Sequence, residues 1–152
     1  MGLALAPGSR LRTRPARWSD APRCARIFLD GRRAACPWQP AERFRLDDYD
    51  TCVADDEVLV AELDGEVVGF ASVDPPARTV HTLFVDPRWR NHGIGSLLLR
   101  EALARLSGPA ELTCAARNAA ARAFYERQGW VAAPDDDAAP LVVYRKPVQS
   151  TR

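Results

Sequence analysis

The chain has 152 residues, of which 47% are hydrophobic and 27% charged, and its formal net charge at pH 7 is +1. This length suits one domain with a sizeable core, and the composition is that of an ordinary soluble protein. A net charge near zero argues against bulk binding to nucleic acid or to an anionic membrane surface as the main role. Lys146 is the single lysine among 21 basic residues, a bias typical of high-GC bacterial coding.

The chain begins with a segment that we expect to be a loose arm. Residues Met1 to Leu11 include an apolar patch but neither a basic n-region nor a run long enough for the core of a signal peptide. The sequence therefore predicts neither export nor a membrane span, and we expect a cytoplasmic protein. Residues 10–147 are expected to form a single domain, with 1–9 and 148–152 as flexible termini.

Two elements precede a segment without a strong pattern. Residues 10–16 predict an edge strand, because apolar residues alternate with arginines and Pro15 interrupts the run. Ser19 is a suitable N-cap for a helix whose apolar residues recur at helical spacing until Gly31. The segment from 32 to 56 follows.

Aromatic residues and then acids mark the segment 32–56. Trp38 and Phe44 are candidates for one wall of a substrate pocket. The acids could attract a cationic substrate. We favour a short helix with a solvated acidic face, because unpaired surface acids are common. The acids are Asp47, Asp48, Asp50, Asp55, Asp56 and Glu57.

A meander of three strands is predicted next. Residues 57–63 and 66–73 are alternating or continuously apolar, and Asp64-Gly65 between them is a strong signal for a type I′ turn. Residues 79–85, rich in β-branched and large apolar types, predict the third strand. Asp86-Pro87 ends it, because proline cannot donate to a sheet ladder.

A glycine-bearing loop then leads into a helix that begins at Ile94 and ends near Ser107. The first turn of a helix presents unpartnered N–H groups and partial positive charge, and Gly93 and Gly95 lack the Cβ atoms that would keep a phosphate away. Arg88 and Arg90 add positive charge nearby. The junction suits a pyrophosphate, although two glycines by themselves would equally serve a tight turn.

The remaining elements complete an α/β fold. The sequence predicts a strand at 110–115, a helix at 119–128 opened by Asn118 and closed by Gly129, and strands at 130–132 and 141–146 around an acidic loop at 134–140. The order β-α-(α)-β-β-β-α-β-α-β-β predicts a mixed sheet with helices on both faces.

The four cysteines carry no recognisable cofactor pattern. They form no Cys-x-x-Cys pair and have no metal-ligand spacing with the two histidines. We therefore expect free thiols and no bound metal. The four residues are Cys24, Cys36, Cys52 and Cys114.

Two segments resemble a known family. The run from Val85, V-D-P-R-W-R-N-H-G-I-G-S-L-L-L, resembles the acetyl-CoA-binding motif of the GNAT superfamily of N-acetyltransferases, R/Q-x-x-G-x-G/A after a strand ending in V-x-P. The run from Asn118 resembles the second GNAT segment, N-x-x-A-x-x-F/L-Y-x-x-x-G-F, with Trp130 where phenylalanine is usual. The resemblance covers most of residues 11–146 and is weakest at 32–56. It implies the GNAT fold, with a central, mostly antiparallel sheet.

The resemblance also implies roles for particular residues. The loop would hold the pyrophosphate of acetyl-CoA through its backbone N–H groups, and the end of the preceding strand would pair with the pantetheine arm and offer an N–H to the thioester oxygen. Tyr125 matches the general acid, with a core aromatic as the alternative. Asn118 matches a residue that binds the pantetheine arm, and a helix N-cap is compatible with that role. The loop residues are Arg90, Asn91, His92, Gly93, Ile94, Gly95 and Ser96, and the strand residues are Leu83, Phe84 and Val85.

The general base is harder to assign. Some family members carry a glutamate five residues before the motif asparagine, where this chain has Thr113, and others carry one early in the central strand, where it has Thr79. His81 is the best remaining candidate because imidazole titrates near neutrality. The alternative is an ordinary strand histidine that is hydrogen-bonded to a neighbouring backbone group. His92 is interpreted as solvent-facing or as a phosphate contact. Further options are a water chain or one of three acids, Glu62, Asp74 and Glu111.

We therefore expect an acetyl-CoA-dependent N-acetyltransferase that acts on a primary amine, in the first place of a small molecule, without a nucleic-acid or membrane partner. One alternative is an acyl-CoA-binding regulatory module without turnover, against which Tyr125 argues because a binder needs no acid beside the sulfur. Another is an acyltransferase with a different acyl group, or with a hydroxyl, peptide or protein acceptor. A homodimer is compatible with this fold.

Overall fold

A computed structural model of the chain describes residues 8–134 and 139–147. The expected flexible termini at 1–9 and 148–152 lie outside the described residues, apart from residues 8 and 9. The expected loop at 134–140 is described only at its two ends. Within the described part, no helix is both long enough and apolar enough to cross a bilayer.

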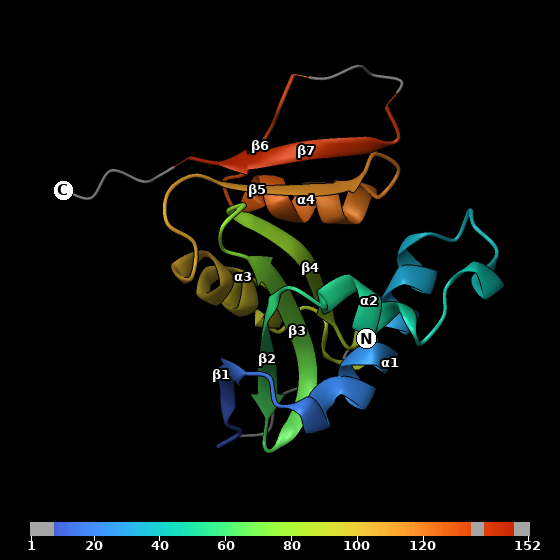
Figure 1. Cartoon of the computed structure of the whole chain (residues 1–152), viewed down its shortest axis with the longest axis vertical. Coiled ribbons are helices and arrows are strands. Elements are labelled where there is room, and N and C mark those ends of the chain that lie inside the picture. The colour runs from blue at the N-terminus through green and yellow to red at the C-terminus, as the bar shows by residue number, and fades with distance from the viewer. Residues whose placement is uncertain (1–7, 135–138, 148–152) are drawn as a thin grey trace.

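The described residues form a seven-stranded sheet flanked by helices (Figure 1). The strands are β1 (Leu11–Pro15), β2 (Glu57–Leu63), β3 (Glu66–Asp74), β4 (Thr79–Val85), β5 (Ala110–Ala115), β6 (Val131–Ala132) and β7 (Leu141–Lys146). The α-helices are α1 (Ala21–Ala35), α2 (Asp48–Val53), α3 (Ile94–Ala104) and α4 (Ala119–Arg127). The strand order is β1-β2-β3-β4-β5-β7-β6, and every neighbouring pair is antiparallel except β4 with β5. This topology confirms the predicted mixed, mostly antiparallel sheet.

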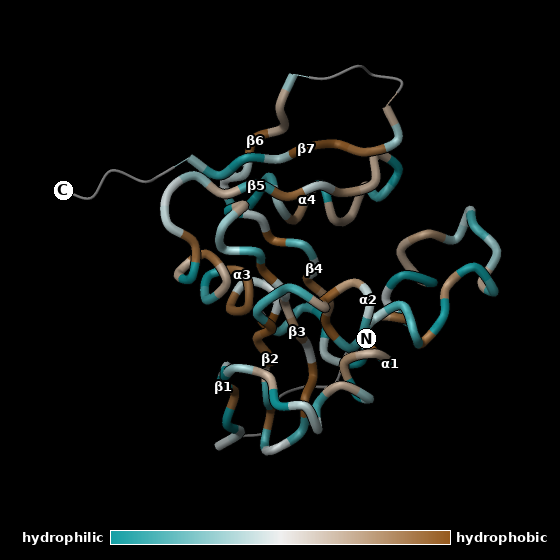
Figure 2. The backbone as a smooth tube through the Cα atoms, in the orientation of Figure 1, coloured by the Kyte–Doolittle hydropathy of each residue, from teal (hydrophilic) through white to brown (hydrophobic). Residues whose placement is uncertain are grey.

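Helices α1 and α3 cover opposite faces of the sheet and create two hydrophobic clusters. Ile94 and Leu98 of α3 pack with Val68 of β3 in the larger cluster. Phe28 of α1 packs with Phe70 of β3 in the smaller one, with their ring centroids 6.1 Å apart. Hydrophobic stretches, brown in Figure 2, lie in the central strands and also in α3 and β7.

Helix α1 differs from the prediction at both ends. Ser19 lies in a short 3-10 turn, and Asp20 rather than Ser19 is the N-cap residue. The carboxylate of Asp20 accepts hydrogen bonds from the N–H of Arg17 at 2.7 Å and from the guanidinium of Arg14 at 2.8 Å, which orders this turn ahead of the helix. Asp20, held by Arg14 and Arg17 six and three positions earlier, therefore takes the place expected for Ser19 at the helix start.

The helix also continues through Gly31, where the sequence predicted its end. A Cβ atom at this position would overlap the ring of Phe84 in β4. Glycine is therefore needed here for close packing between helix and sheet and not for a turn. Four more residues extend α1 to Ala35.

The predicted turns and later elements agree more closely with the structure. Asp64 and Gly65 have φ values of 50° and 86°, as a type I′ turn requires. Helix α3 ends at Ala104, before the predicted Ser107, because the N–H groups of the next two residues donate to carbonyls three positions earlier. Strands β5 and β7 and helix α4 lie within one residue of their predicted bounds.

Strand β4 is irregular on both of its edges. Against β3, Ser72 opposes Thr82 but Val73 opposes Val80, so His81 is an additional residue in a β-bulge. Against β5, Thr79 opposes Glu111 and the register goes no further. Figure 1 shows β5 and β7 running across the direction of β3 and β4. The end of β4 at 83–85 is therefore paired on its β3 edge and not with β5.

Candidate active site

The loop between β4 and α3 reaches the helix through two left-handed residues. Asn91 has φ 66° and Gly93 has φ 77°. Gly93 is the N-cap residue, and its carbonyl accepts a hydrogen bond from the N–H of Leu97 at 3.0 Å. The N–H groups of residues 94–96 donate to no other described residue. Three parallel donors at the positive end of the helix dipole are therefore available to an anion.

A cavity of about 360 Å³ adjoins this helix start. Arg100 and Lys146 bring two positive charges to it, and the buried indole N–H of Trp130 has no hydrogen-bond partner among the described residues. The two cations suit an anionic ligand. The lining residues are Gly93, Ser96, Leu97, Leu99, Arg100, Leu103, Gln128, Trp130 and Lys146.

Hydrogen bonds across this cavity tie three elements together. The ammonium of Lys146 on β7 donates to the carbonyl oxygen of Gln128 at 2.6 Å. The side-chain amide of Gln128 donates in turn to Oγ of Ser96 on α3 at 3.1 Å. The end of α4 is therefore held against both β7 and the helix that would carry the anion.

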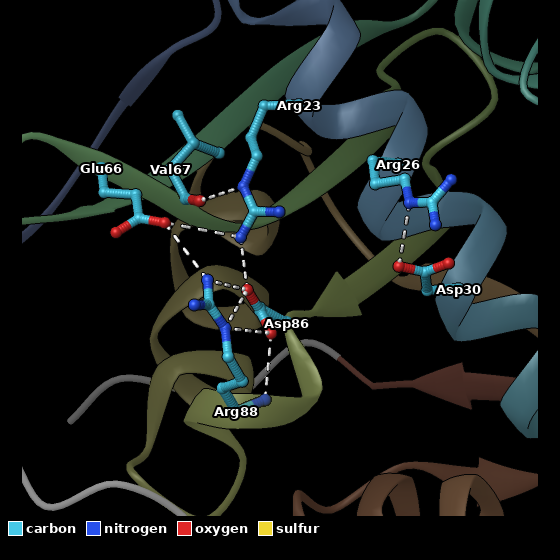
Figure 3. A network of polar contacts seen from close by, with 7 residues as sticks. All are labelled: Arg23, Arg26, Asp30, Glu66, Val67, Asp86 and Arg88. Carbon is cyan, nitrogen blue, oxygen red and sulfur yellow. Dashed lines mark hydrogen bonds and ion pairs between the residues drawn. The ribbon is translucent and has the colours of Figure 1, made fainter.

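Asp86 anchors the beginning of the loop (Figure 3). Its N–H donates to the carbonyl of Val68 at 2.7 Å, and its buried carboxylate accepts from the N–H and the guanidinium of Arg88, both at 2.9 Å, and from the guanidinium of Arg23. Burial acts to raise the pKa of Asp86, but the hydrogen bonds from Arg88 and Arg23 outweigh it and hold the pKa below its usual value.

The two arginines expected beside the phosphate loop, Arg88 and Arg90, differ in their partners. The guanidinium of Arg88 is held by Asp86 and by Glu66 at 3.2 Å, whereas Arg90 is exposed. Nδ1 of His92 lies 2.8 Å from the carbonyl oxygen of Arg90. Because a carbonyl can only accept, this nitrogen donates, and His92 braces the loop from within.

Tyr125 lies on α4 within a group of aromatic rings. Its ring centroid is 5.3 Å from that of Phe124, 6.2 Å from that of Trp130 and 6.1 Å from that of Tyr144. Burial, and to a smaller extent the charge of Cys114, raises the pKa of Tyr125 above its usual value. The phenol therefore stays protonated at neutral pH, as a proton donor must.

The start of α4 meets the segment that follows α1. Oδ1 of Asn118 accepts a hydrogen bond from the N–H of Ala121 at 3.1 Å, so this side chain caps the helix. Beside it, the guanidinium of Arg117 lies 5.1 Å from the ring centroid of Trp38. Phe44, the other predicted wall residue, packs instead against Arg32 of α1, at 5.0 Å. Trp38 is therefore brought to the start of α4, and Phe44 is not.

His81 projects from the bulge of β4 and meets an acid. Its Nδ1 lies 2.8 Å and 3.0 Å from the two carboxylate oxygens of Asp56. The side chain of Asp56 is only 3% exposed, so the favoured interpretation of a solvated acidic face is wrong for this residue, although Asp50 and Asp55 are exposed as predicted. Asp56, Asp74 and His81 place one potential ligand atom each within 4.8 Å of one another.

Two other candidate bases are held by arginines. Glu62 forms ion pairs with Arg12 at 3.1 Å and Arg14 at 2.7 Å, and the hydrogen bond from Arg14 is the main reason that the pKa of Glu62 lies below its usual value. Glu111 pairs with Arg145 at 3.4 Å. Among the candidate bases, His81 has the partner best suited to orient a proton acceptor.

Sequence reasoning missed the residues that act by tertiary contact. It did not connect Arg23 with Asp86, nor Lys146 and Trp130 with the helix start at Gly93. The one usable signal was the position of Asp56, because an acid just before a buried strand can lie close to the neighbouring strands. No local pattern identifies its partner.

Replacing Gly93 by alanine is expected to weaken binding of acetyl-CoA, the ligand that the sequence resemblance implies, about tenfold or more. A Cβ atom disfavours the left-handed conformation by roughly 1–2 kcal/mol, and the backbone relaxation that follows turns the first-turn N–H groups away from a common anion. Isothermal titration calorimetry measures the dissociation constant. Gly65→Ala is the matched control, because Gly65 is also left-handed, at φ 86°, and a Cβ at either glycine meets no atom within 4 Å. Equal affinities in the two variants would contradict this role of the loop.

Comparison with known proteins places these features in a family. A profile described as an acetyltransferase (GNAT) domain matches residues 54–132. The chain is 34% identical over 120 residues to the N-alpha-acetyltransferase RimI of Mycobacterium tuberculosis, an alignment that covers 74% of this chain and 73% of that protein. It is 40% identical over 86 residues to an uncharacterized N-acetyltransferase of Archaeoglobus fulgidus, with 48% of this chain aligned and 58% of the length of that relative spanned.

The fold is also found among solved structures. The PaiA N-acetyltransferase of Thermoplasma acidophilum, solved in complex with coenzyme A, superposes with a TM-score of 0.79 and 16% identity over 91% of this chain and 99% of that chain. A ribosomal-protein-alanine N-acetyltransferase of Brucella melitensis gives a TM-score of 0.68 and 23% identity over 90% and 99% of the two chains. At these identities the likeness shows a shared fold.

Proposed function

Because the chain belongs to the GNAT superfamily of N-acetyltransferases, we propose that it transfers the acetyl group of acetyl-CoA to a primary amine of a small molecule. The observation that carries this proposal is the start of α3, where three N–H groups without a partner among the described residues adjoin a cavity that Arg100 and Lys146 line. Main-chain donors and two cations match the phosphates of coenzyme A.

In this proposal, two backbone segments bind acetyl-CoA. Residues 91–96 hold the diphosphate through their N–H groups. The strand edge at 83–85, which β5 does not pair, hydrogen-bonds the pantetheine arm and directs one N–H at the thioester oxygen. That N–H stabilises the negative charge that develops on the oxygen during attack. Asn118 lies at the start of α4 and completes the binding of the arm.

The proposed chemistry moves three protons. His81 takes one proton from the substrate ammonium, and the freed amine forms a bond to the thioester carbonyl carbon. The carbon–sulfur bond then breaks, and Tyr125 donates its phenolic proton to the departing thiolate. The acetylated nitrogen loses its second proton to solvent. Solvent later restores the proton of Tyr125 and removes that of His81, so one proton is released for each acetyl group transferred. The partly buried phenol, whose raised pKa keeps it protonated at neutral pH, is consistent with this assignment of Tyr125.

A second acceptor class is favoured by one relative. The aligned protein of Mycobacterium tuberculosis is named as an N-alpha-acetyltransferase, which acts on the amine at the start of a polypeptide. We therefore propose a peptide N-terminal amine as the second candidate acceptor. Both acceptors use the same attack on the thioester.

A panel of amines distinguishes these acceptors. Purified protein is incubated with acetyl-CoA and either small primary amines or short peptides with free N-termini, and release of the coenzyme A thiol is followed. We expect release above the rate without acceptor for members of one class, confirmed by mass spectrometry of the acetylated product. Tight acetyl-CoA binding with no transfer to any amine would instead favour a regulatory module without turnover.

We further propose that the protein acts in the cytoplasm. All four cysteines are free thiols in the structure, as expected in a reducing compartment. Fractionation of cells that express the tagged chain tests this location.

A further inference from the structure

We propose that Asp56 is a positioning residue for His81. Its carboxylate accepts the hydrogen of Nδ1 and so fixes the neutral imidazole in the tautomer whose Nε2 can accept a proton. This inference rests on the proposed function, in which His81 deprotonates the substrate amine. Asp56 itself touches no reacting atom.

The contact distances set the direction of the hydrogen bond. Both oxygens of Asp56 lie within 3.0 Å of Nδ1. An ionised carboxylate can only accept, and a neutral imidazole carries one N–H, so the hydrogen lies on Nδ1 and Nε2 keeps its lone pair. Once Nε2 takes up a proton, the carboxylate also stabilises the imidazolium.

Asp56 and His81 differ in how far their side chains are exposed to solvent. The side chain of Asp56 is 3% exposed and that of His81 is 40% exposed. The acid is therefore sheltered within the protein, while the imidazole reaches the surface where a substrate amine can arrive. A hydrogen bond to a buried charge is stronger than one in water, which makes it an effective constraint on the ring.

The fold holds both residues in place. The N–H of Asp56 donates to the carbonyl of Val53 at 2.9 Å, so the acid is fixed at the end of α2 just before β2 begins. His81 is the bulged residue of β4, and the next residue, Thr82, is buried and hydrogen-bonded to Ser72 at 2.7 Å. The hydrogen bond between Thr82 and Ser72 fixes the register next to the bulge. The bulge in turn directs the side chain of His81 toward Asp56.

Other charged groups near the imidazole belong to the neighbouring strands. Asp74 at the end of β3 has a carboxylate oxygen within 4.8 Å of the other two residues. Glu57 at the start of β2 is paired with Arg105 at 3.4 Å, and Glu111 of β5 is paired with Arg145. Asp74 therefore adds negative charge near His81, and Asp56 forms the direct hydrogen bond.

The test compares Asp56→Asn with Asp55→Asn, an exposed neighbour that contributes the same charge. An asparagine can donate its amide hydrogen to Nδ1, which favours the opposite tautomer and places the hydrogen on Nε2. We expect kcat, measured with an acceptor that the amine panel identifies, to fall about 10- to 100-fold in Asp56→Asn and to stay unchanged in Asp55→Asn. The KM for acetyl-CoA should stay unchanged in both variants. In the His81→Ala background, Asp56→Asn should cause no further loss of kcat, because Asp56 acts only through His81.

Imidazole NMR reports the tautomer of His81 directly, separately from any change in stability. The chain has two histidines, so the His92→Gln variant assigns the signals of His81. Long-range proton–nitrogen spectra should show Nδ1–H in the wild type and a shift toward Nε2–H in Asp56→Asn. Thermal melts of both variants report any separate loss of stability.

The outcomes separate the two proposals. If the wild type acetylates an amine but Asp56→Asn keeps its kcat or its tautomer, the positioning role is overturned and the proposed function stands. If the wild type acetylates no amine, the proposed function fails and this role fails with it. Activity that a chelator removes and Zn²⁺ restores would make the trio of Asp56, Asp74 and His81 a metal site and would also overturn the positioning role.

Discussion

Replacing Tyr125 by phenylalanine is expected to lower kcat about 100-fold or more while the affinity for acetyl-CoA stays nearly unchanged. The ring is held among Phe124, Trp130 and Tyr144, and phenylalanine fills the same space. In the proposed mechanism the hydroxyl acts only when the thiolate forms, so its loss should affect the transition state and leave the bound ground state intact. Steady-state kinetics and calorimetric titration measure the two quantities.

The control for this experiment is Tyr144→Phe. Tyr144 is the neighbouring tyrosine, and its hydroxyl donates to Glu126 at 2.5 Å and accepts from Arg122 at 3.0 Å. Loss of this hydroxyl should lower the melting temperature and spare kcat, because it serves the packing of β7 on α4. Equal losses of kcat and acetyl-CoA affinity in Tyr125→Phe would show that Tyr125 has a structural role.

Replacing Asp86 by alanine is expected to lower the free energy of unfolding by about 2–3 kcal/mol. The change leaves Arg23 and Arg88 without their shared buried acceptor and removes the carboxylate that orders the turn after β4. Both arginines are partly exposed, which keeps the expected loss below that of a fully buried pair. For a chain of this length the loss corresponds to roughly 5–10 °C in melting temperature, and acetyl-CoA binding should weaken because the loop begins at Asp86.

The pH dependence of stability provides a second measurement on Asp86. Because its pKa is below the usual value, the ionised carboxylate stabilises the fold above the unfolded-state pKa, near ~4. This stabilisation is lost as the pH falls through the lower, folded-state pKa. Thermal melts from pH 7 downward should therefore show the gap between wild type and Asp86→Ala closing under acidic conditions.

The matched variant for Asp86→Ala is Glu66→Ala. Glu66 contacts the same two arginines, at 3.7 Å and 3.2 Å, but its side chain is 57% exposed. Its removal should cost less than about 1 kcal/mol, because exposed ion pairs contribute little. If the two variants lose equal stability, burial of the Asp86 carboxylate is not what makes it important.

Much of the fold follows from neighbouring residues. The turn at Asp64-Gly65, the stop at Asp86-Pro87 and the cap at Asn118 depend on backbone angles and hydrogen bonds that span only a few positions. The alternation of apolar residues likewise indicated where the strands lie along the chain. The two motifs located the candidate loop and Tyr125 through their resemblance to the GNAT family.

The sequence by itself determined most of the elements, since these depend on short-range geometry, and its resemblance to the GNAT family located the candidate anion site at the start of α3. Only the tertiary structure decided which charges meet. His81 and Asp56 are 25 positions apart, and Arg23 and Asp86 are 63 apart. Whether a carboxylate is buried or solvated depends on how distant elements pack, and the same packing makes Gly31 a contact for Phe84 and not a helix end. Local patterns contain no information about such packing.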